Sequence, residues 1–208
     1  QDHIQLLGLD IDDEVLAVAL SGRYPLTDFS WQFERLSAEE YRQICPVEGS
    51  DALVSDTLRS GIQWLHANAC DRELPEKIGQ QDIVIANRFL CHMQPRLASD
   101  CLRTVTRLVS PGGYLFISGV DLEVRQQVMR EMGFTAVTEN LEAIHIGDKS
   151  LMNGWPWKCW GLEPFDNRRD DWIERYAIVY RKPGQKKSGS SASAPDERIQ
   201  RELDQVDN

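Results

Sequence analysis

The stretch that most constrains the fold runs from Gln80 to Asp121 and reads QQDIVIANRFLCHMQPRLASDCLRTVTRLVSPGGYLFISGVD. It begins with a short β-rich run, Ile83–Ala86, and a helix is predicted to start near Pro95 because proline suits a first helical turn. Apolar residues then recur on one helical face, at Leu97, Cys101, Leu102, Val105, Leu108 and Val109. SPGG is predicted to end this helix before a second strand, YLFISG. Strand, helix and strand in this order are typical of a parallel sheet.

Segments on the N-terminal side extend the same alternation. HIQLLGLDID is an apolar run that ends in acid, which predicts a central strand buried on both faces. DDEVLAVALSGRYP is predicted to be a helix that Asp12 or Asp13 caps and that Gly22 or Pro25 stops. A short second helix is expected to start at Ser37, and IQWLHANAC is interpreted as another strand.

Segments on the C-terminal side complete the pattern. DLEVRQQVMREMGF is predicted to be a helix that Asp121 caps and Gly133 stops. TAVTENLEAIHIG and RYAIVYRK are predicted to be strands flanking the tryptophan-rich NGWPWKCWGLEPF, which is either a packed lid or core segment or a substrate wall. We expect one α/β domain with a mostly parallel sheet over residues 1–182, and a flexible polar tail over residues 183–208.

Composition narrows the classes of function. The net charge is −10 and the pI is near 4.9, so a nucleic acid backbone would be repelled on average. No apolar run approaches the roughly 18 residues of a membrane span, and the N-terminus lacks signal-peptide features, so a cytoplasmic protein without a membrane partner is expected. The five cysteines form no C-x-x-C pair and the histidines share no ligand spacing, which argues against a disulfide framework and against a metal site.

Polar residues follow three of the predicted strands, at Asp10, Asn68 and Asn87. Because the carboxyl ends of parallel strands meet at one edge of a sheet, we expect these side chains to line one crevice. A carboxylate can accept hydrogen bonds from both hydroxyls of a ribose, and an asparagine can match the polar edge of adenine. The pattern predicts a nucleotide-like cofactor. The alternatives are a helix N-terminal acid for Asp10 and a turn residue for Asn68.

Taken together, LLGLDIDDEVL, HANAC, DIVIANRFLCHM and RLVSPGGYLFISG resemble the class I S-adenosylmethionine-dependent methyltransferases. The most similar type is CheR, which methylates glutamates of chemotaxis receptors. The resemblance covers Ile4 to Gly119 by motif and reaches Lys182 by topology. It implies a Rossmann-like fold with an antiparallel last strand, S-adenosylmethionine as cofactor, and a protein carboxylate or a small molecule as methyl acceptor.

The resemblance also implies which residues bind the cofactor. The acid that holds the ribose in the family corresponds to Asp10. The asparagine near the adenine corresponds to Asn68, with Ala69 beside it. The strand end that faces the methyl donor corresponds to ANRFLCHM, so Asn87 is expected beside the cofactor as well.

Two departures from the family pattern concern the acceptor. The chain reads Asn87 then Arg88 where the family has arginine then asparagine, and His92 stands where the family has a tyrosine near the transferred methyl. Arg88 can hold an acceptor carboxylate through two hydrogen bonds, and His92 is the candidate base if the acceptor is a hydroxyl. A carboxylate needs no base, because its reference pKa of about 4.3 leaves it ionised at neutral pH. The region between Ser37 and Ile62 is short, so receptor docking is not expected.

The Gly-rich loop with which class I enzymes hold the methionine end of the cofactor does not occur between Gln1 and Ile11. The first strand of the fold, which normally lies between IQLLGLDI and DIVIAN, is therefore expected to be missing. We predict from this that the chain is the C-terminal part of a longer protein and binds the cofactor weakly by itself. A degenerate methyltransferase fold that only binds a partner is the rival interpretation, and a small-molecule O-methyltransferase would differ only in its acceptor.

Overall fold

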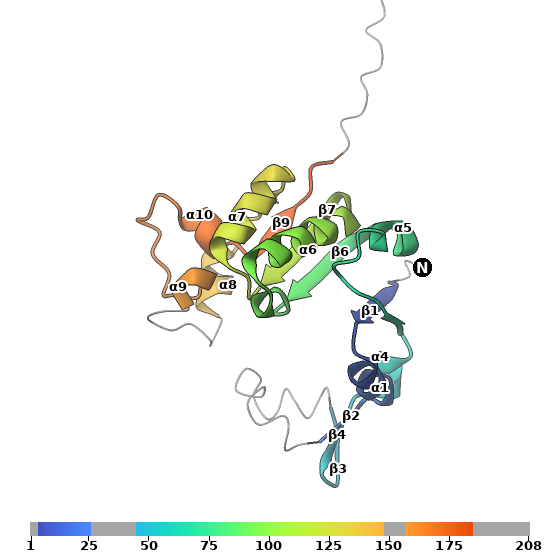
Figure 1. Cartoon of the computed structure of the whole chain (residues 1–208). Coiled ribbons are helices and arrows are strands. Elements are labelled where there is room, and N and C mark those ends of the chain that lie inside the picture. The colour runs from blue at the N-terminus through green and yellow to red at the C-terminus, as the bar shows by residue number, and fades with distance from the viewer. Residues whose placement is uncertain (1–3, 26–44, 148–156, 185–208) are drawn as a thin grey trace, which may run out of the picture.

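The structure of the protein is a computed structural model that describes residues 4–25, 45–147 and 157–184. Within these ranges, strands and helices alternate along the chain (Figure 1), which confirms the predicted α/β content. β1 (Leu6–Asp10) runs parallel to β5 (Ile62–His66), and β6 (Gln81–Asn87) runs parallel to β7 (Val109–Ser118). Both parallel pairs contain a strand that the sequence predicted to end in a polar residue.

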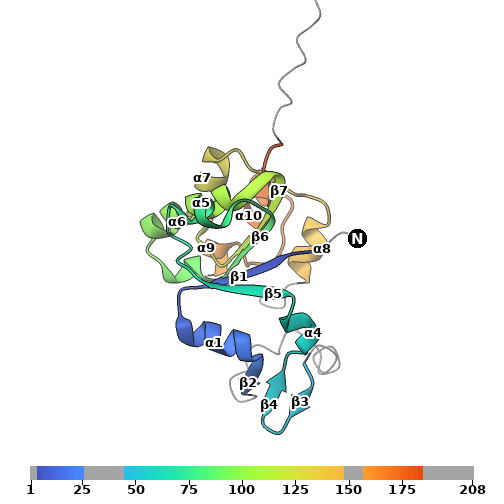
Figure 2. The ribbon, with the colours of Figure 1, turned by 90° about the vertical axis from the view of Figure 1, so that its right-hand side faces the viewer.

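The main sheet has four strands in the order β6, β7, β9, β8. β9 (Val179–Arg181), the last strand, pairs antiparallel with β7 and with β8 (Thr135–Ala136), which confirms the predicted direction of the last strand. A smaller antiparallel sheet is built from β2 (Arg23–Pro25), β4 (Asp51–Leu53) and β3 (Val47–Glu48). The β1–β5 pair forms a third sheet, and Figure 2 shows it between the small sheet and the body that contains β6 and β7.

The prediction of one mostly parallel sheet is therefore only partly correct for the described residues. β1 has a single hydrogen-bonded neighbour there, and so does β6. Apolar side chains along these two strands are correspondingly exposed: Leu6 is 48% exposed, Ile83 59% and Ile85 69%. The prediction that HIQLLGLDID forms a central strand buried on both faces is wrong. Such burial requires a neighbouring strand on each side, and β1 has only one among the described strands.

The core lies between the main sheet and the helices that cover it. α6 (Pro95–Leu108) buries Cys101, Leu102 and Val105 against Leu115 and Ile117 of β7. The other helices among the described residues are α1 (Asp13–Ser21), α4 (Asp56–Arg59), α5 (Leu74–Ile78), α7 (Leu122–Glu131), α8 (Leu141–Ile146), α9 (Trp157–Trp160), α10 (Trp172–Tyr176) and the short 3-10 helix η2 (Leu90–His92). The helical face read from the sequence of α6 is thus the face that forms the core.

The predicted helix caps are present. Asp12, rather than Asp13, caps α1 by accepting hydrogen bonds from the backbone N–H groups of the next turn, and Gly22 ends the helix with φ 62°. Asp121 caps α7 by accepting a 2.9 Å bond from the Glu123 N–H. α7 ends near Gly133, which has φ 71°. Both helices begin and end where the sequence predicts, because the residues that cap or end a helix lie next to its ends.

Three local predictions are wrong. SPGG does not separate α6 from the next strand, because it belongs to β7, where Gly113 lets the backbone of Asp82 approach closely. Most of TAVTENLEAIHIG is not a strand, since residues from Leu141 onward form α8. RYAIVYRK is a strand only over β9, because its first residues close α10.

Several predictions fall outside the described residues, namely the helix at Ser37, the first part of the tryptophan-rich segment and residues 185–208. All five cysteines are free. Across residues 4–25, 45–147 and 157–184, no helix has both the length and the apolar character that crossing a membrane requires.

Candidate active site

Residues of β1, β5 and α5 and the start of β6 lie around one cavity of about 250 Å³. It is lined by Gln5 and Leu7 of the first strand region, Gln63 and Leu65 of β5, Lys77 and Ile78 of α5, and Gln81 at the start of β6. Since the strands of each pair are parallel, the carboxyl ends of the two strands in a pair share one edge. Within each pair, the polar residues that follow the strands therefore belong to the same edge.

A contact joins the segments that follow β5 and β6. The Sγ atom of Cys70, two residues after Asn68, lies 4.0 Å from the Sδ atom of Met93, the residue after His92. Cys70 also reaches α6, where burial and then a hydrogen bond with Cys70 raise the pKa of the Cys101 thiol. The turn that carries Asn68 and the segment that follows β6 are thus packed together on the core.

Asp10 ends β1 and Asn68 follows the neighbouring strand β5, because Asp10 is in register with His66 and its carbonyl oxygen accepts a 2.8 Å bond from the Ala67 N–H. Oδ1 of Asp10 accepts a 3.0 Å hydrogen bond from the Asp12 N–H, and Oδ1 of Asn68 accepts a 2.9 Å bond from the Cys70 N–H. Both side chains therefore shape turns, and for Asn68 this is the alternative role that the sequence left open. Among the described residues, no hydrogen bond occupies the second carboxylate oxygen of Asp10 or the amide nitrogen of Asn68.

The end of β6 has an unusual backbone. Arg88 has φ 59°, a conformation that few residues other than glycine adopt, and its N–H donates a 3.0 Å bond to the Ser118 carbonyl oxygen. Asn87 is exposed, and its Oδ1 accepts a 3.3 Å bond from the Ser118 hydroxyl. Gly119 packs on this turn so closely that a Cβ there would lie 2.9 Å from the Arg88 Cα. The strain at Arg88 is held by the neighbouring strand, a pattern common at functional sites.

Replacing Arg88 by glycine is predicted to raise the free energy of unfolding by about 1 kcal/mol, because glycine adopts φ near 60° without steric cost. Urea denaturation of the full-length protein measures the change. Arg96→Gly, within the first turn of α6, is the control and should lower stability, since glycine is a poor helix former. A lower stability for Arg88→Gly would show that the arginine side chain contributes more than its backbone strain costs.

The other predicted residues lie in the segments that follow β5 and β6. Ala69 packs on the core, and His92 is exposed at the end of η2, beside Met93. Among the described residues no hydrogen bond joins Asp10 or Asn68 to Asn87, Arg88 or His92. The site thus has two parts, one on the β1–β5 pair and one on the β6–β7 pair, which meet through the contact of Cys70 with Met93.

Two residues at the ends of these strands were not predicted from the sequence to belong to the site. His66 lies at the end of β5, and its Nε2 donates to the Ile11 carbonyl oxygen at 2.8 Å, which fixes the turn after Asp10. Ser118 orients Asn87 from the end of β7. Each follows an apolar strand run directly, which was the signal available in the sequence. Across the described residues, no group of three or more His, Cys, Asp or Glu side chains is arranged to hold a metal ion.

The family of the chain follows from comparison with known proteins. The family description "CheR methyltransferase, SAM binding domain" matches residues 1–137. The chain belongs to the CheR methyltransferase family. The predicted family is thereby confirmed, and S-adenosylmethionine is the cofactor of this domain. In the CheR-family chain, the strand ends described above and all the predicted cofactor-binding positions fall inside the matched residues.

Comparisons with individual proteins add little to this assignment. No curated protein gives a significant match. One similar solved structure is the MycE methyltransferase of the mycinamycin biosynthetic pathway in complex with Mg and SAH, with 14% identity, a TM-score of 0.34, and 95% of this chain and 41% of that chain covered. Another is an O-methyltransferase family protein from Burkholderia thailandensis, with 22% identity, a TM-score of 0.31, and coverage of 62% and 37%. The CheR-family chain spans less than half the length of either structure.

Proposed function

We propose that this protein transfers the methyl group of S-adenosylmethionine to a carboxylate oxygen at the carboxyl ends of β1, β5 and β6. The observation that carries the proposal is the 4.0 Å contact of Cys70 with Met93, which supports one shared crevice for Asn68 and the segment after β6. We further propose that residues 1–182 act as one Rossmann-like class I methyltransferase domain that contains both parallel strand pairs.

The residues present fit the cofactor. The free oxygen of the Asp10 carboxylate offers an acceptor for ribose hydroxyls, and the amide nitrogen of Asn68 offers a donor for an adenine ring nitrogen. Ala69 is partly buried beside them and provides an apolar surface for the base. When bound, S-adenosylmethionine supplies a methyl group that is activated by the positive sulfonium. Asn87, oriented by the Ser118 hydroxyl, is proposed to lie beside this methyl group.

The acceptor is proposed to be a carboxylate because of Arg88. Its guanidinium is exposed at the end of β6, and the strained turn holds its backbone by the 3.0 Å bond to Ser118. A guanidinium can bind a carboxylate through two parallel hydrogen bonds, which orients one oxygen for attack. Since the carboxylate is already ionised, proximity and orientation suffice, and these contribute up to about 7–11 kcal/mol in favourable cases.

The test uses the full-length protein and S-adenosylmethionine labelled in its methyl group, with a mixture of protein and small-molecule carboxylates as acceptors. The label is expected to enter the acceptor fraction and to be released by alkali as volatile methanol, because alkali cleaves methyl esters. Arg88→Ala is expected to lower this transfer by about 10-fold or more, the effect of removing hydrogen bonds to a charged group. Transfer of an alkali-stable label would instead indicate a hydroxyl acceptor, with His92 as the base.

A binding module is the second candidate. It is favoured by the exchanged order of Asn87 and Arg88, which places the arginine in the left-handed turn. In that case the full-length protein would bind S-adenosylmethionine but would transfer no label to any acceptor fraction.

A further inference from the structure

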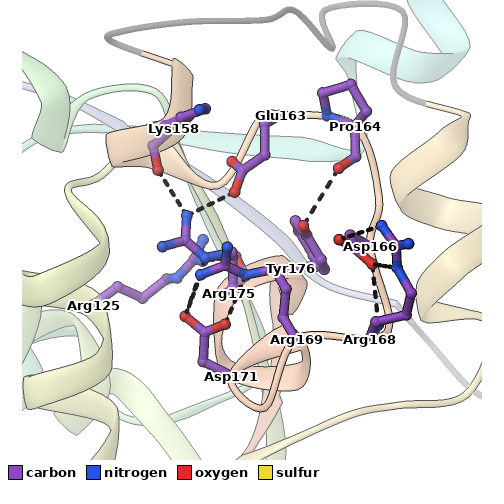
Figure 3. Close-up of polar contacts among 10 residues, drawn as sticks. All are labelled: Arg125, Lys158, Glu163, Pro164, Asp166, Arg168, Arg169, Asp171, Arg175 and Tyr176. Atoms are coloured by element: carbon purple, nitrogen blue, oxygen red, sulfur yellow. Dashed lines mark hydrogen bonds and ion pairs between the residues drawn. The ribbon is translucent and has the colours of Figure 1, made fainter.

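A second, larger cavity of about 610 Å³ lies beyond the N-terminus of α7, and Figure 3 shows the polar side chains around it. Four carboxylates and four cations line it, and its three arginines form ion pairs of 2.7 or 2.8 Å with neighbouring carboxylates. None of the predicted site residues lies in its wall. This balanced set of charges favours neither an anion nor a cation, so the cavity points to no class of ligand.

The turn that joins β1 to α1 has a more specific arrangement. Ile11 and Asp12 alone connect Asp10, the last residue of β1, to Asp13, the first residue of α1. Ile11 is 61% exposed, so apolar packing does little to fix the turn. Among the described strands β1 has one hydrogen-bonded neighbour, β5. Support for the turn from a neighbouring strand must therefore come from β5.

His66, the last residue of β5, supplies this support. It is in register with Asp10, and the Ala67 N–H donates a 2.8 Å bond to the Asp10 carbonyl oxygen. Nε2 of His66 donates a second bond, also of 2.8 Å, to the next carbonyl oxygen along the chain, that of Ile11. The imidazole thus continues the hydrogen bonding between the two strands by one residue, into the turn.

This bond is linked to the Asp10 carboxylate through one peptide group. The Ile11 carbonyl and the Asp12 N–H belong to the same peptide unit, which is planar and rigid. His66 binds the carbonyl end of this unit, and Oδ1 of Asp10 accepts a 3.0 Å bond from its N–H end. Hydrogen bonds in such a chain also polarise and strengthen one another. The orientation of the Asp10 carboxylate therefore depends on the His66 donor.

We propose that His66 is a positioning residue for the cofactor: through the Ile11–Asp12 peptide, it holds the Asp10 carboxylate in the orientation that binds the ribose of S-adenosylmethionine. This inference rests on the proposed function, in which Asp10 binds the ribose. Two rival roles lead to different results in the experiments that follow. In one, the exposed imidazole contacts the cofactor directly, and in the other it acts through Asp13, whose Oδ1 lies 3.9 Å from Nε2.

Two substitutions of His66 separate its hydrogen bond from its ring. His66→Phe keeps a planar ring but has no donor, whereas His66→Gln has an amide nitrogen at the same number of bonds from Cβ as Nε2. In isothermal titrations of the full-length protein, His66→Phe is expected to bind S-adenosylmethionine about fivefold more weakly than the wild type, the effect of one lost hydrogen bond. His66→Gln is expected to bind within about twofold of the wild type. Wild-type affinity in His66→Phe, or an equal loss in both variants, would overturn the proposal.

Asp13→Asn is the control for the neighbouring carboxylate. It removes the charge near Nε2 of His66 and leaves the Ile11 carbonyl in place. Affinity for S-adenosylmethionine should stay within about twofold of the wild type, because exposed ion pairs contribute little. A loss as large as that of His66→Phe would assign the effect to the pair with Asp13 and would contradict the proposal.

A double-mutant cycle with Asp10→Ala tests whether His66 acts through Asp10. When the carboxylate is absent, its orientation no longer matters, so adding His66→Phe to Asp10→Ala should weaken binding by less than about twofold more. A further loss of about fivefold would show that His66 contributes independently of Asp10, as a direct contact with the cofactor would. That result would also overturn the proposal.

Measuring methyl transfer in the same variants separates this inference from the proposed function. If the affinities follow the expected pattern but no label reaches a carboxylate, only the proposed methyl transfer fails. If label is transferred and Asp10→Ala weakens cofactor binding but His66→Phe does not, only the role of His66 is wrong. Wild-type affinity in Asp10→Ala would contradict both.

Discussion

Replacing Arg125 by alanine is expected to lower the free energy of unfolding by about 3 kcal/mol. Arg125 on α7 is 1% exposed, and its Nη2 donates hydrogen bonds of 2.6 and 3.4 Å to the carbonyl oxygens of Arg175 and Glu174 at the end of α10. A cation is favoured at a helix C-terminus, where carbonyl oxygens lack partners. The substitution removes these bonds and leaves a cavity in the core, and both effects destabilise the fold.

Arg130→Ala is the matched control on the same helix. Its side chain is 72% exposed and lies 3.7 Å from Glu174 in a surface ion pair, so its loss should change stability by less than about 0.5 kcal/mol. Urea denaturation of both variants gives the comparison. If Arg125→Ala were no less stable than Arg130→Ala, the contact between α7 and α10 would not be a major contribution to the fold.

The elements predicted correctly from the sequence are those with local signals. α7 has its cap at Asp121 and its stop near Gly133, and α6 shows a full apolar face after Pro95. Each signal lies within a few residues of the element that it defines, so no knowledge of distant contacts is needed. The same holds for the polar strand ends at Asp10 and Asn87, which the sequence placed correctly at the ends of β1 and β6.

The elements predicted wrongly depend on contacts between distant residues. LEAIHI reads as a short apolar run, which fits a strand or a helix equally well. It is the helix α8 because Leu141 and His145, four residues apart, are both buried, and His145 bonds to Glu163, 18 residues later in the chain. The cavity of about 610 Å³ could not be predicted from the sequence for the same reason. The charged residues around Glu163 show no periodicity that separates buried from exposed side chains.

The second large expected effect is a loss of cofactor affinity when Asp10 is replaced. If its carboxylate binds the ribose, Asp10→Ala should lower the affinity of the full-length protein for S-adenosylmethionine by about 10- to 100-fold, the effect of losing roughly 1.5–3 kcal/mol of charge-assisted hydrogen bonds. Stability should fall only slightly, because within the described part of the chain the carboxylate accepts one hydrogen bond, of 3.0 Å, from the exposed Asp12 N–H. Asp12→Ala should show the opposite pattern, since it removes the cap of α1, worth about 1 kcal/mol of stability, and no proposed cofactor contact.

The most direct test of the proposed crevice is isothermal titration of S-adenosylmethionine into the full-length wild type, Asp10→Ala and Asp12→Ala. We expect the wild type and Asp12→Ala to bind with the same affinity and Asp10→Ala to bind at least about 10-fold more weakly. Wild-type affinity in Asp10→Ala would contradict this account, because the cofactor would then bind away from the carboxyl ends of β1 and β5.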